Sequence, residues 1–282
     1  MSGVLYICPT PIGNLEDITL RTLRILKEVD LIACEDTRNT IKLLNYYEIK
    51  NKLTSYHENN KKTKTSILIE KLKAGLSLAL VSDARMPGIS DPGYDLIKMA
   101  IEEDIIVSVL PGASALVCSI VYSGLSSRRI AFEGFLPKNN NKRKEVLEEL
   151  KDETRTIVLY EAPHHIVNTL ELLEDYVGKD RKIVIVKELT KKHESRMIFT
   201  IKSAIEFFSV NKPLGEYILI IDGLSLAQKK ENDYSKWNNI NILDHMKIYE
   251  NENKKEAMKK VAHDRGITKR EVYNILNKKG EE

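Results

Sequence analysis

The sequence contains little cysteine and no long apolar run. Among 282 residues there are three cysteines, Cys8, Cys34 and Cys118, which lie far apart and lack the spacing of metal ligands. We therefore expect neither a disulfide framework nor a metal site. No apolar run approaches the roughly 18 residues that span a membrane, so an integral membrane protein is not expected. The first nine residues also lack the pattern of a secretion signal, which makes the cytoplasm the expected location.

Several common catalytic signatures are also absent. The chain has no Walker loop, no His-Glu-x-x-His pair, no Gly-x-Ser-x-Gly elbow and no Gly-x-Gly-x-x-Gly fingerprint after its first apolar run. ATP hydrolysis and hydride transfer therefore lack their usual sequence markers, and other patterns must indicate the function.

Short apolar runs alternate with amphipathic segments over the first 226 residues, which is typical of an α/β protein. A helix is predicted at residues 19–29, with Leu20, Leu23 and Leu26 on one face, and another begins after Asp91, which would cap it. Strands are predicted at residues 4–8, 31–34, 76–81, 105–110, 130–132, 156–160, 182–186 and 216–221.

Two breaks in this pattern divide the chain. Gly124 and its neighbouring serines separate a predicted helix from the next strand, and all eight prolines lie at or before Pro213. Beyond Gly223 the chain is rich in Asn, Lys and Glu. We therefore expect an N-terminal α/β domain at 1–123, a second α/β domain at 124–226 and a small helical appendage at 227–282.

The appendage has a helical pattern and holds the whole positive excess of the chain. The 44 basic residues exceed the 41 acidic ones by three, and this excess lies within residues 227–282. Gly266 separates two apolar stripes, and Thr268 with Glu271 forms a capping box. This pattern indicates a helix-turn-helix or, equally, a helical hairpin used for docking or dimerisation. The stripes comprise Ala257, Met258, Val261, Ala262, Val272, Ile275 and Leu276, and the second helix carries Lys269, Arg270, Lys278 and Lys279.

Another basic cluster lies within residues 138–144. It contains Lys138, Lys142, Arg143 and Lys144 and no acid. Such a run is usual on a solvated loop or helix start, and its functional interpretation is contact with phosphates.

Four loops rich in Pro, Gly, Ser and Asp follow predicted strands, at residues 9–15, 81–93, 111–115 and 160–165. Open α/β sheets bind ligands at the carboxyl ends of their strands, so these loops form the expected site. The second is longer than a strand-to-helix link requires, and the third offers small residues and free N–H groups at a helix start. The first, taken alone, is equally explained as a rigid connection.

These loops and five further motifs resemble a known family. The motifs are Cys-Glu-Asp-Thr-Arg at 34–38, Ser-Tyr-His-Glu-Asn at 55–59, Phe-Glu-Gly-Phe-Leu-Pro at 132–137, Lys-Glu-Leu-Thr-Lys at 187–191 and Gly-Glu-Tyr at 215–217. In order and spacing they resemble the ribosomal RNA small subunit methyltransferase I family of the tetrapyrrole-methylase superfamily. The resemblance runs to about Gly223 and includes the basic helical tail.

The resemblance implies S-adenosylmethionine-dependent 2′-O-methylation of a cytidine in 16S ribosomal RNA, at the decoding centre of the small ribosomal subunit. It also implies two α/β domains with the cofactor in the cleft between them, and a homodimer. Asp83 is the acid expected to bind the cationic cofactor, with capping of the loop turns as its alternative role. The expected cofactor residues are Pro11, Gly13, Ser82, Asp83, Ala84, Ser90, Gly112, Ser114 and Ala115.

A base would assist the weakly acidic ribose hydroxyl. The candidates are Glu35, Asp36, His57 and Glu58, each of which alternatively serves as a structural cap or an RNA hydrogen-bond partner. Arg38 is expected to bind phosphate, because its planar guanidinium matches anionic oxygens. Further RNA contacts are expected from Lys138, Lys142, Arg143, Lys144, Lys269 and Arg270.

Arg85 stands where the family usually has glycine. A backbone suited to glycine and a like charge near the sulfonium would oppose cofactor binding, whereas a side chain reaching an RNA phosphate would add a substrate contact. Two alternative functions therefore stay open: a weak or inactive homologue that binds ribosomal RNA, and a small-molecule, tetrapyrrole-type methyltransferase. The basic tail and the cluster at 138–144 favour RNA.

Overall fold

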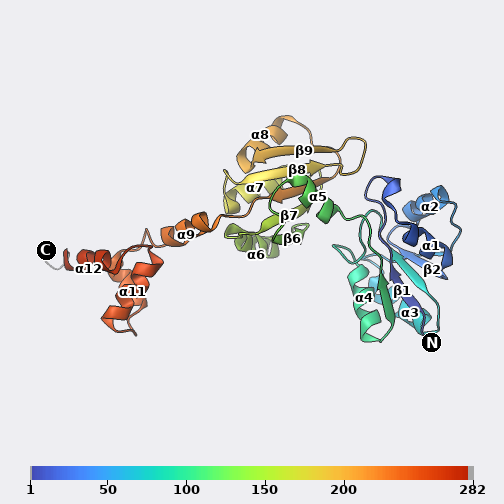
Figure 1. Cartoon of the computed structure of the whole chain (residues 1–282), viewed down its shortest axis with the longest axis horizontal. Helices are drawn as coiled ribbons and strands as arrows, with labels where there is room; N and C mark the ends of the chain where they lie inside the picture. The colour runs from blue at the N-terminus through green and yellow to red at the C-terminus, as the bar shows by residue number, and fades with distance from the viewer. Residues whose placement is uncertain (1, 279–282) are drawn as a thin grey trace.

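The computed structural model describes residues 2–278 and consists of three units in a row (Figure 1). Each of the first two units contains one five-stranded sheet, and the described part of the third contains helices only. None of the helices among these residues is both long and apolar enough to cross a membrane.

The first sheet is entirely parallel, with the strand order β3-β2-β4-β1-β5. Parallel neighbours need crossover connections, and helices supply them here. The central strand β4 is buried at all four positions, as expected for a sheet covered on both faces. The strands are β1 (Val4–Ile7), β2 (Leu31–Cys34), β3 (Leu53–Ser55), β4 (Leu78–Val81) and β5 (Ile106–Val109), and the helices are α1 (Leu20–Glu28), α2 (Thr37–Tyr46), α3 (Lys61–Lys73) and α4 (Gly93–Glu102).

The predicted helix at 19–29 is confirmed as α1, which has Thr19 as its N-cap and Val29 as its C-cap. The predicted apolar face is wrong at Leu20, which is 86% exposed, whereas Ile25 and Leu26 are buried. Six residues turn an α-helix by about 600°, so Leu20 and Leu26 point about 120° apart and do not share a face.

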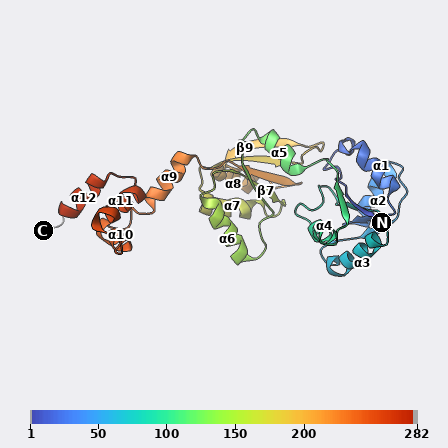
Figure 2. The same cartoon turned by 60° about the horizontal axis from the view of Figure 1, so that its bottom comes forward.

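The second sheet is mixed, with the order β6-β7-β10-β8-β9. Only β6 and β7 pair in parallel. Three helices cover one face, and α5 lies alone on the other (Figure 2). The strands are β6 (Ile130–Gly134), β7 (Thr156–Glu161), β8 (Lys182–Lys187), β9 (Ser195–Thr200) and β10 (Tyr217–Ile221), and the helices are α5 (Ala115–Ser123), α6 (Asn140–Lys151), α7 (Ile166–Val177) and α8 (Ile201–Val210).

The chain crosses between the two sheets through residues 110–114. β5 is an edge strand of the first sheet, and α5, which follows at once, packs through Ile120 on the second. The sequence placed the domain boundary after α5, at residue 123, whereas in the structure the chain passes to the second sheet before α5. Gly124 ends α5 with a φ of +72°, the left-handed conformation in which glycine is favoured.

The sequence pattern did not predict β3 and β9, which both lie at sheet edges. β3 has only three residues, and β9 alternates between half-buried and exposed positions. Neither strand therefore has the continuous apolar run that marks the buried strands.

The third unit consists of α9 (Leu226–Ser235), α10 (Ile242–Ile248), α11 (Lys254–Asp264) and α12 (Lys269–Lys278). The predicted pair of helices around Gly266 is confirmed as α11 and α12. The capping box is also present: Thr268 N donates to Glu271 Oε2 at 2.6 Å, and Glu271 N donates to Thr268 Oγ1 at 3.2 Å. The helices α9 and α10 were not predicted.

The apolar stripe of this unit is confirmed except at Ile275. Val261 and Val272 are fully buried in a cluster that also contains Ile242 from α10. Ile275 is 41% exposed, because the buried face of α12 is centred on Val272 and Leu276 instead. Lys279 lies outside the described residues.

Candidate functional site

The loops after β1, β4 and β5 meet at the carboxyl edge of the first sheet. Thr10 Oγ1 donates to the Ser82 carbonyl at 2.8 Å and accepts from Arg85 N at 3.3 Å. A Cβ on Gly112 would lie 2.7 Å from the Pro9 Cβ, so the third loop packs closely on the first. The three predicted cofactor loops thus form one connected edge.

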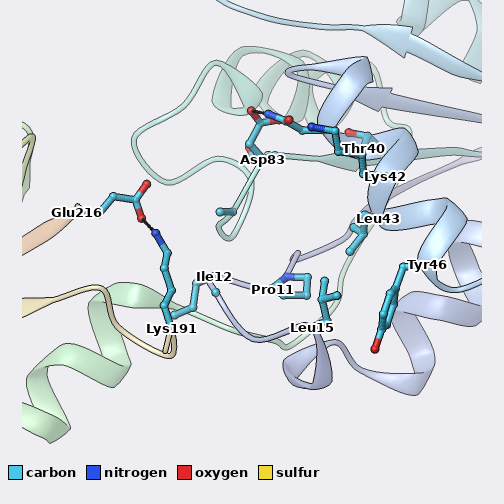
Figure 3. Close-up of a pocket in the computed structure, with 14 residues that line it drawn as sticks. Pro11, Ile12, Leu15, Thr40, Lys42, Leu43, Tyr46, Asp83, Lys191 and Glu216 are labelled. Carbon is cyan, nitrogen blue, oxygen red and sulfur yellow. Dashed lines mark hydrogen bonds and ion pairs between the residues drawn. The ribbon is translucent and has the colours of Figure 1, made fainter. Parts of the chain in front are cut away.

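A pocket of about 360 Å³ opens between this edge and the second unit (Figure 3). Side chains of α2, including Tyr46, form one wall, and Lys191 and Glu216 of the second unit complete it. Five of the nine expected cofactor residues line it, namely Pro11, Gly13, Ser82, Asp83 and Ala84.

The other four expected cofactor residues, Ser90, Gly112, Ser114 and Ala115, lie outside the lining of this pocket. Ser114 caps α5, since its Oγ accepts the N–H of Val117 at 3.5 Å, and Ala115 is the first residue of that helix. Ser90 has a φ of +57° and lies against the second unit. These four residues border the junction between the two units.

Asp83 joins the loop after β4 to the start of α2. Its Oδ1 accepts from Asp36 N at 3.2 Å, and its Oδ2 accepts from Asn39 Nδ2 at 3.0 Å. Its capping contacts are therefore with α2 and not with the turns of its own loop. Each carboxylate oxygen has a second lone pair, which leaves capacity for a ligand in the pocket that Asp83 lines.

Arg85 does not have the backbone strain expected from the sequence. The positive φ values in its loop belong to Gly88 (88°) and Ser90 (57°). That expectation is wrong because these neighbours make the turn. The Arg85 guanidinium donates from Nη1 to the Ser90 carbonyl at 3.2 Å and so stabilises the same loop.

Glu35 differs from the other two candidate carboxylates, Asp36 and Glu58, in its surroundings, and none of the three lines the pocket. Its Oε2 is buried and has no hydrogen-bond partner within residues 2–278. Burial raises the pKa of Glu35 above its ordinary value, and the nearby charges of Asp83 and Asp91 add to this against the opposing effect of Arg85. A raised pKa makes a carboxylate a better proton acceptor.

Asp36 is a helix cap and ion-pair partner. Its Oδ1 accepts from Arg38 N at 2.8 Å, and its Oδ2 accepts from Arg38 Nη2 at 2.7 Å. These hydrogen bonds lower the pKa of Asp36 to about 2, so it is a weak base. Arg38 itself has an 85% exposed side chain beside this pair.

His57 and Glu58 organise the start of α3. His57 N donates to Asn60 Oδ1 at 2.9 Å, and Glu58 pairs with Lys61 at 2.9 Å. Lys61 also pairs with Asp95 at 2.8 Å. Neither His57 nor Glu58 lines the pocket. The contacts above match the structural alternative for both residues, and the buried His57 Nδ1 has no hydrogen-bond partner within residues 2–278.

Lys191 crosses the side of the pocket formed by the second unit (Figure 3). Its Nζ donates to Glu188 Oε1 at 3.0 Å and to Glu216 Oε2 at 2.8 Å. An ammonium has three donors, so one more is available for a ligand. The motifs at 187–191 and 215–217 marked these residues, but sequence reasoning gave them no place in the site.

The loop that carries Lys191 also contacts the first loop of the N-terminal unit. Thr190 Oγ1 accepts from Asn14 N at 3.1 Å, and a Cβ on Gly13 would lie only 2.5 Å from that oxygen. Glu188 and Thr190 have φ values of +50° and +66°. Such unfavourable backbone conformations cluster at functional sites.

The basic residues Lys138, Lys142, Arg143 and Lys144 lie at the start of α6, whose N-cap is Asn139. The salt bridges formed within the described chain include none of these four cations. Positive charge is unfavourable at a helix N-terminus, so the cluster does not stabilise α6. Lys269 and Arg270 occupy the corresponding first turn of α12.

Comparison with known proteins identifies the family. Residues 4–205 match the model of tetrapyrrole (corrin/porphyrin) methylases. A Halalkalibacterium halodurans protein named ribosomal RNA small subunit methyltransferase I is 44% identical over 98% of this chain and 95% of its own length. The chain belongs to this methyltransferase family. As a member it is an S-adenosylmethionine-dependent methyltransferase.

A Thermotoga maritima protein of the same name is 45% identical and aligns 78% of this chain with 99% of its own length. That methyltransferase therefore has no counterpart for about a fifth of this chain.

Solved structures agree with the fold of this methyltransferase. Diphthine synthase has a TM-score of 0.63 at 14% identity, covering 81% of this chain and 94% of its own. Uroporphyrin-III C-methyltransferase from Thermus thermophilus, in a complex with S-adenosyl homocysteine, has a TM-score of 0.56 at 16% identity, covering 77% and 97%. At these identities the likeness establishes the fold alone.

Proposed function

We propose that this methyltransferase modifies the ribose 2′-hydroxyl of a cytidine in 16S ribosomal RNA, at the decoding centre of the small subunit. The observation that carries the proposal is the 44% identity over 98% of the chain to a relative named ribosomal RNA small subunit methyltransferase I. The choice of a cytidine 2′-hydroxyl rests on the ordered motifs that resemble the family.

The pocket between the two units is the proposed cofactor site. S-adenosylmethionine has a cationic sulfur and amine, a carboxylate and an apolar body. Asp83 and Glu216 supply negative charge, Lys191 supplies a donor for the carboxylate, and Pro11 and Leu15 supply apolar contacts. The residues present thus suit each part of this cofactor, which supplies an activated methyl group when bound.

Glu35 is the proposed base, supported by its unpartnered Oε2 and its raised pKa. When bound, the cofactor would supply its methyl group to the ribose oxygen, and the Glu35 carboxylate would accept the proton that this hydroxyl loses. The products are a methyl ether, a protonated Glu35 and a neutral thioether. Glu35 does not itself line the pocket, but it directly precedes Asp36, whose N–H donates to the pocket residue Asp83.

The clusters at the starts of α6 and α12 are the proposed RNA contacts, together with Arg38. They carry positive charge that stabilises neither helix, and RNA phosphates neutralise such charge with release of counterions. A small tetrapyrrole acceptor has no use for two basic surfaces on separate units, which favours RNA over that alternative.

The homodimer is also proposed, through an apolar surface on β5 and α5. Ile106, Val109, Val117 and Val121 are between 58% and 75% exposed, and β5 is an unpaired sheet edge. A second copy would cover both features. Val121→Glu is expected to convert the dimer into monomers in sedimentation velocity at micromolar concentration, whereas Val210→Glu on α8 is the exposed control. An unchanged mass for the α5 variant contradicts this interface.

The function is tested on small ribosomal subunits from cells that lack this methyltransferase. Incubation with the protein and labelled S-adenosylmethionine is expected to give one 2′-O-methylcytidine per 16S RNA in a nucleoside mass analysis. Subunit binding without transfer would support the inactive homologue instead. Transfer to uroporphyrinogen III, and not to the subunit, would support the small-molecule alternative.

A further inference from the structure

Three aromatic side chains form a cluster where β6 and β7 end, outside the lining of the pocket. Tyr160 contacts Phe132 with ring centroids 5.1 Å apart and Phe135 with centroids 5.7 Å apart, both edge to face. We call Phe132, Phe135 and Tyr160 the aromatic platform. Phe132 and Tyr160 are half-buried in the core under α5, whereas Phe135 is 49% exposed.

The aromatic platform lies against the second cofactor loop. Gly134 has a φ of +63°, and a Cβ there would lie 2.6 Å from Ser90 Oγ. The Ser90 carbonyl in turn accepts from Arg85 Nη1 at 3.2 Å. Arg85 also opposes the increase that burial causes in the pKa of Tyr160, so its charge acts on the platform itself. The exposed Phe135 ring thus packs on a tyrosine that lies within the influence of the Arg85 charge.

The chain leads directly from this ring to the basic cluster. Phe135 precedes Lys138 by three residues, and Lys142, Arg143 and Lys144 follow within the first five residues of α6. An exposed aromatic face beside unneutralised cations is the arrangement that binds single-stranded nucleic acid, because bases stack on the ring while phosphates meet the cations. A protein partner would have to bury these cations without gaining their phosphate contacts.

We propose that Phe135 stacks on a nucleobase of the RNA substrate. This nucleobase lies beside the target ribose and is turned out of the RNA helix. This rests on the proposed RNA methylation and adds a specific residue to it. The edge-to-face contact with Tyr160 positions the ring. Because stacking tolerates any base, Phe135 would position the RNA strand and would contribute little to sequence specificity.

The test uses the full-length protein and a ten-nucleotide single-stranded RNA that contains one 2-aminopurine, whose fluorescence is quenched by stacking. Phe135→Leu removes the ring, Phe135→Tyr keeps it, and Val210→Ala removes an exposed apolar side chain elsewhere in the second unit. We expect Phe135→Leu to lose the quenching and to bind about ten- to a hundredfold more weakly. The other two variants should match the wild type.

Three controls keep this result separate from other roles of the ring. S-adenosylmethionine affinity, measured by calorimetry, should change less than twofold in Phe135→Leu, and the mass in sedimentation should not change. Equal quenching and affinity in Phe135→Leu and wild type overturn the proposal. An equal loss of cofactor affinity overturns it by placing the ring in the cofactor site, and an altered mass overturns it by placing the ring in a subunit interface. Methylation of small subunits is scored separately, so failure of the proposed function is distinguishable from failure of stacking.

Discussion

Glu35 and Asp36 are neighbours in the sequence, yet their surroundings change their proton affinities in opposite directions. Arg38 holds the pKa of Asp36 at about 2, whereas burial raises the pKa of Glu35. A pair of carboxyl groups separated in this way is how a site assigns one group to proton transfer and another to structure. The sequence motif named both residues but gave no means of choosing, because the difference comes from tertiary contacts.

Glu35→Gln is expected to lower kcat for RNA methylation by about 10²- to 10⁴-fold, the range for loss of a general base. The base acts when ionised, so wild-type activity should fall as the pH falls through the raised pKa of Glu35. The residual activity of the glutamine variant should not show this decrease at low pH. Its melting temperature should not decrease, since a buried charge has been removed. A pH profile of the variant parallel to that of the wild type would assign the proton to another group.

Among the elements, the loop of residues 187–191 and the first loop of the N-terminal unit depend on each other. Gly13 permits their contact because no side chain fits between it and Thr190. This contact also positions a pocket residue, since Gly13 and Lys191 both line the pocket and a Cβ on Gly13 would lie 2.6 Å from Lys191 Cγ.

Gly13→Ala is expected to force the two loops apart and to weaken S-adenosylmethionine binding at least about tenfold, or roughly 1.4 kcal/mol. The matched control is Gly178→Ala, at a glycine with a φ of +94° and no atom within 4 Å of an added Cβ. The control should lower the melting temperature slightly through backbone strain and leave cofactor affinity unchanged. Calorimetric titration compares the two, and equal affinities would show that the loop contact is not needed for binding.

The elements that could be predicted from the sequence are those whose stabilising pattern lies within their own residues. Buried strands such as β4 are marked by continuous apolar runs, and α1 by the spacing of its leucines. The edge strand β9 has half its positions in solvent and depends on pairing with β8. The same limit applies to the site. The loop residue Asp83 could be predicted from its position after a strand, whereas Lys191 reaches the pocket only once the two units meet.

At the scale of the whole molecule, the helical unit is attached to the second unit by few contacts. Lys236 Nζ pairs with Asp152 Oδ2 at 3.1 Å, and Leu224 N donates to the Glu153 carbonyl at 2.9 Å just before α9. Figure 1 shows α9 linking the remaining helices to the second unit. None of the tail residues that the structure describes, 227–278, lines the pocket.

Deleting residues 227–282 is therefore expected to leave cofactor affinity within a few fold. RNA-subunit affinity should fall, with a shallower dependence on salt, because each lost phosphate contact removes about 0.9 from the log–log slope for a duplex and about 0.7 for a single strand. Binding isotherms at several salt concentrations measure both quantities. The Thermotoga maritima relative, which has no counterpart for about a fifth of this chain, is a natural comparison. An unchanged slope would contradict a docking role for the tail.

The tail also contains a buried histidine that makes its stability depend on pH. His245 Nδ1 accepts from Arg265 Nε at 3.0 Å, and Nε2 lies 3.1 Å from Asp264 Oδ2, which also accepts from the Tyr249 hydroxyl at 2.6 Å. Since arginine only donates, Nδ1 cannot carry a proton in this arrangement. Burial lowers the pKa of His245 against the opposing effect of its hydrogen bond with Asp264, and the charge of Arg265 lowers this pKa further.

The unfolded tail therefore binds a proton more readily than the folded tail below about pH 6.5, the ordinary histidine value. Stability of the tail should decrease as the pH falls from about 6.5 towards the lowered pKa, and level off below it. Trp237, the single tryptophan, stacks on the imidazole at 3.8 Å and reports tail unfolding in urea. His245→Gln should be less stable at pH 8 but insensitive to this pH change. A wild-type tail with constant stability from pH 8 to 5 would contradict the assignment.

Residues 110–114 form the connection between the first two units. In the described chain these five residues are the one covalent passage from the first sheet to the second, and they reach at most about 18 Å. This short connection limits how far the two units can separate, and the contacts between Asn14 and Thr190 and between Ser90 and Gly134 join them as well. Gly112 and Ser114 belong to this connection and border the junction between the two units. A ligand that contacts them would therefore also restrict the relative movement of the units. Cofactor binding would then also affect the proposed RNA contacts. The angle between the two units sets the distance of Lys191 and of the basic start of α6 from the first sheet.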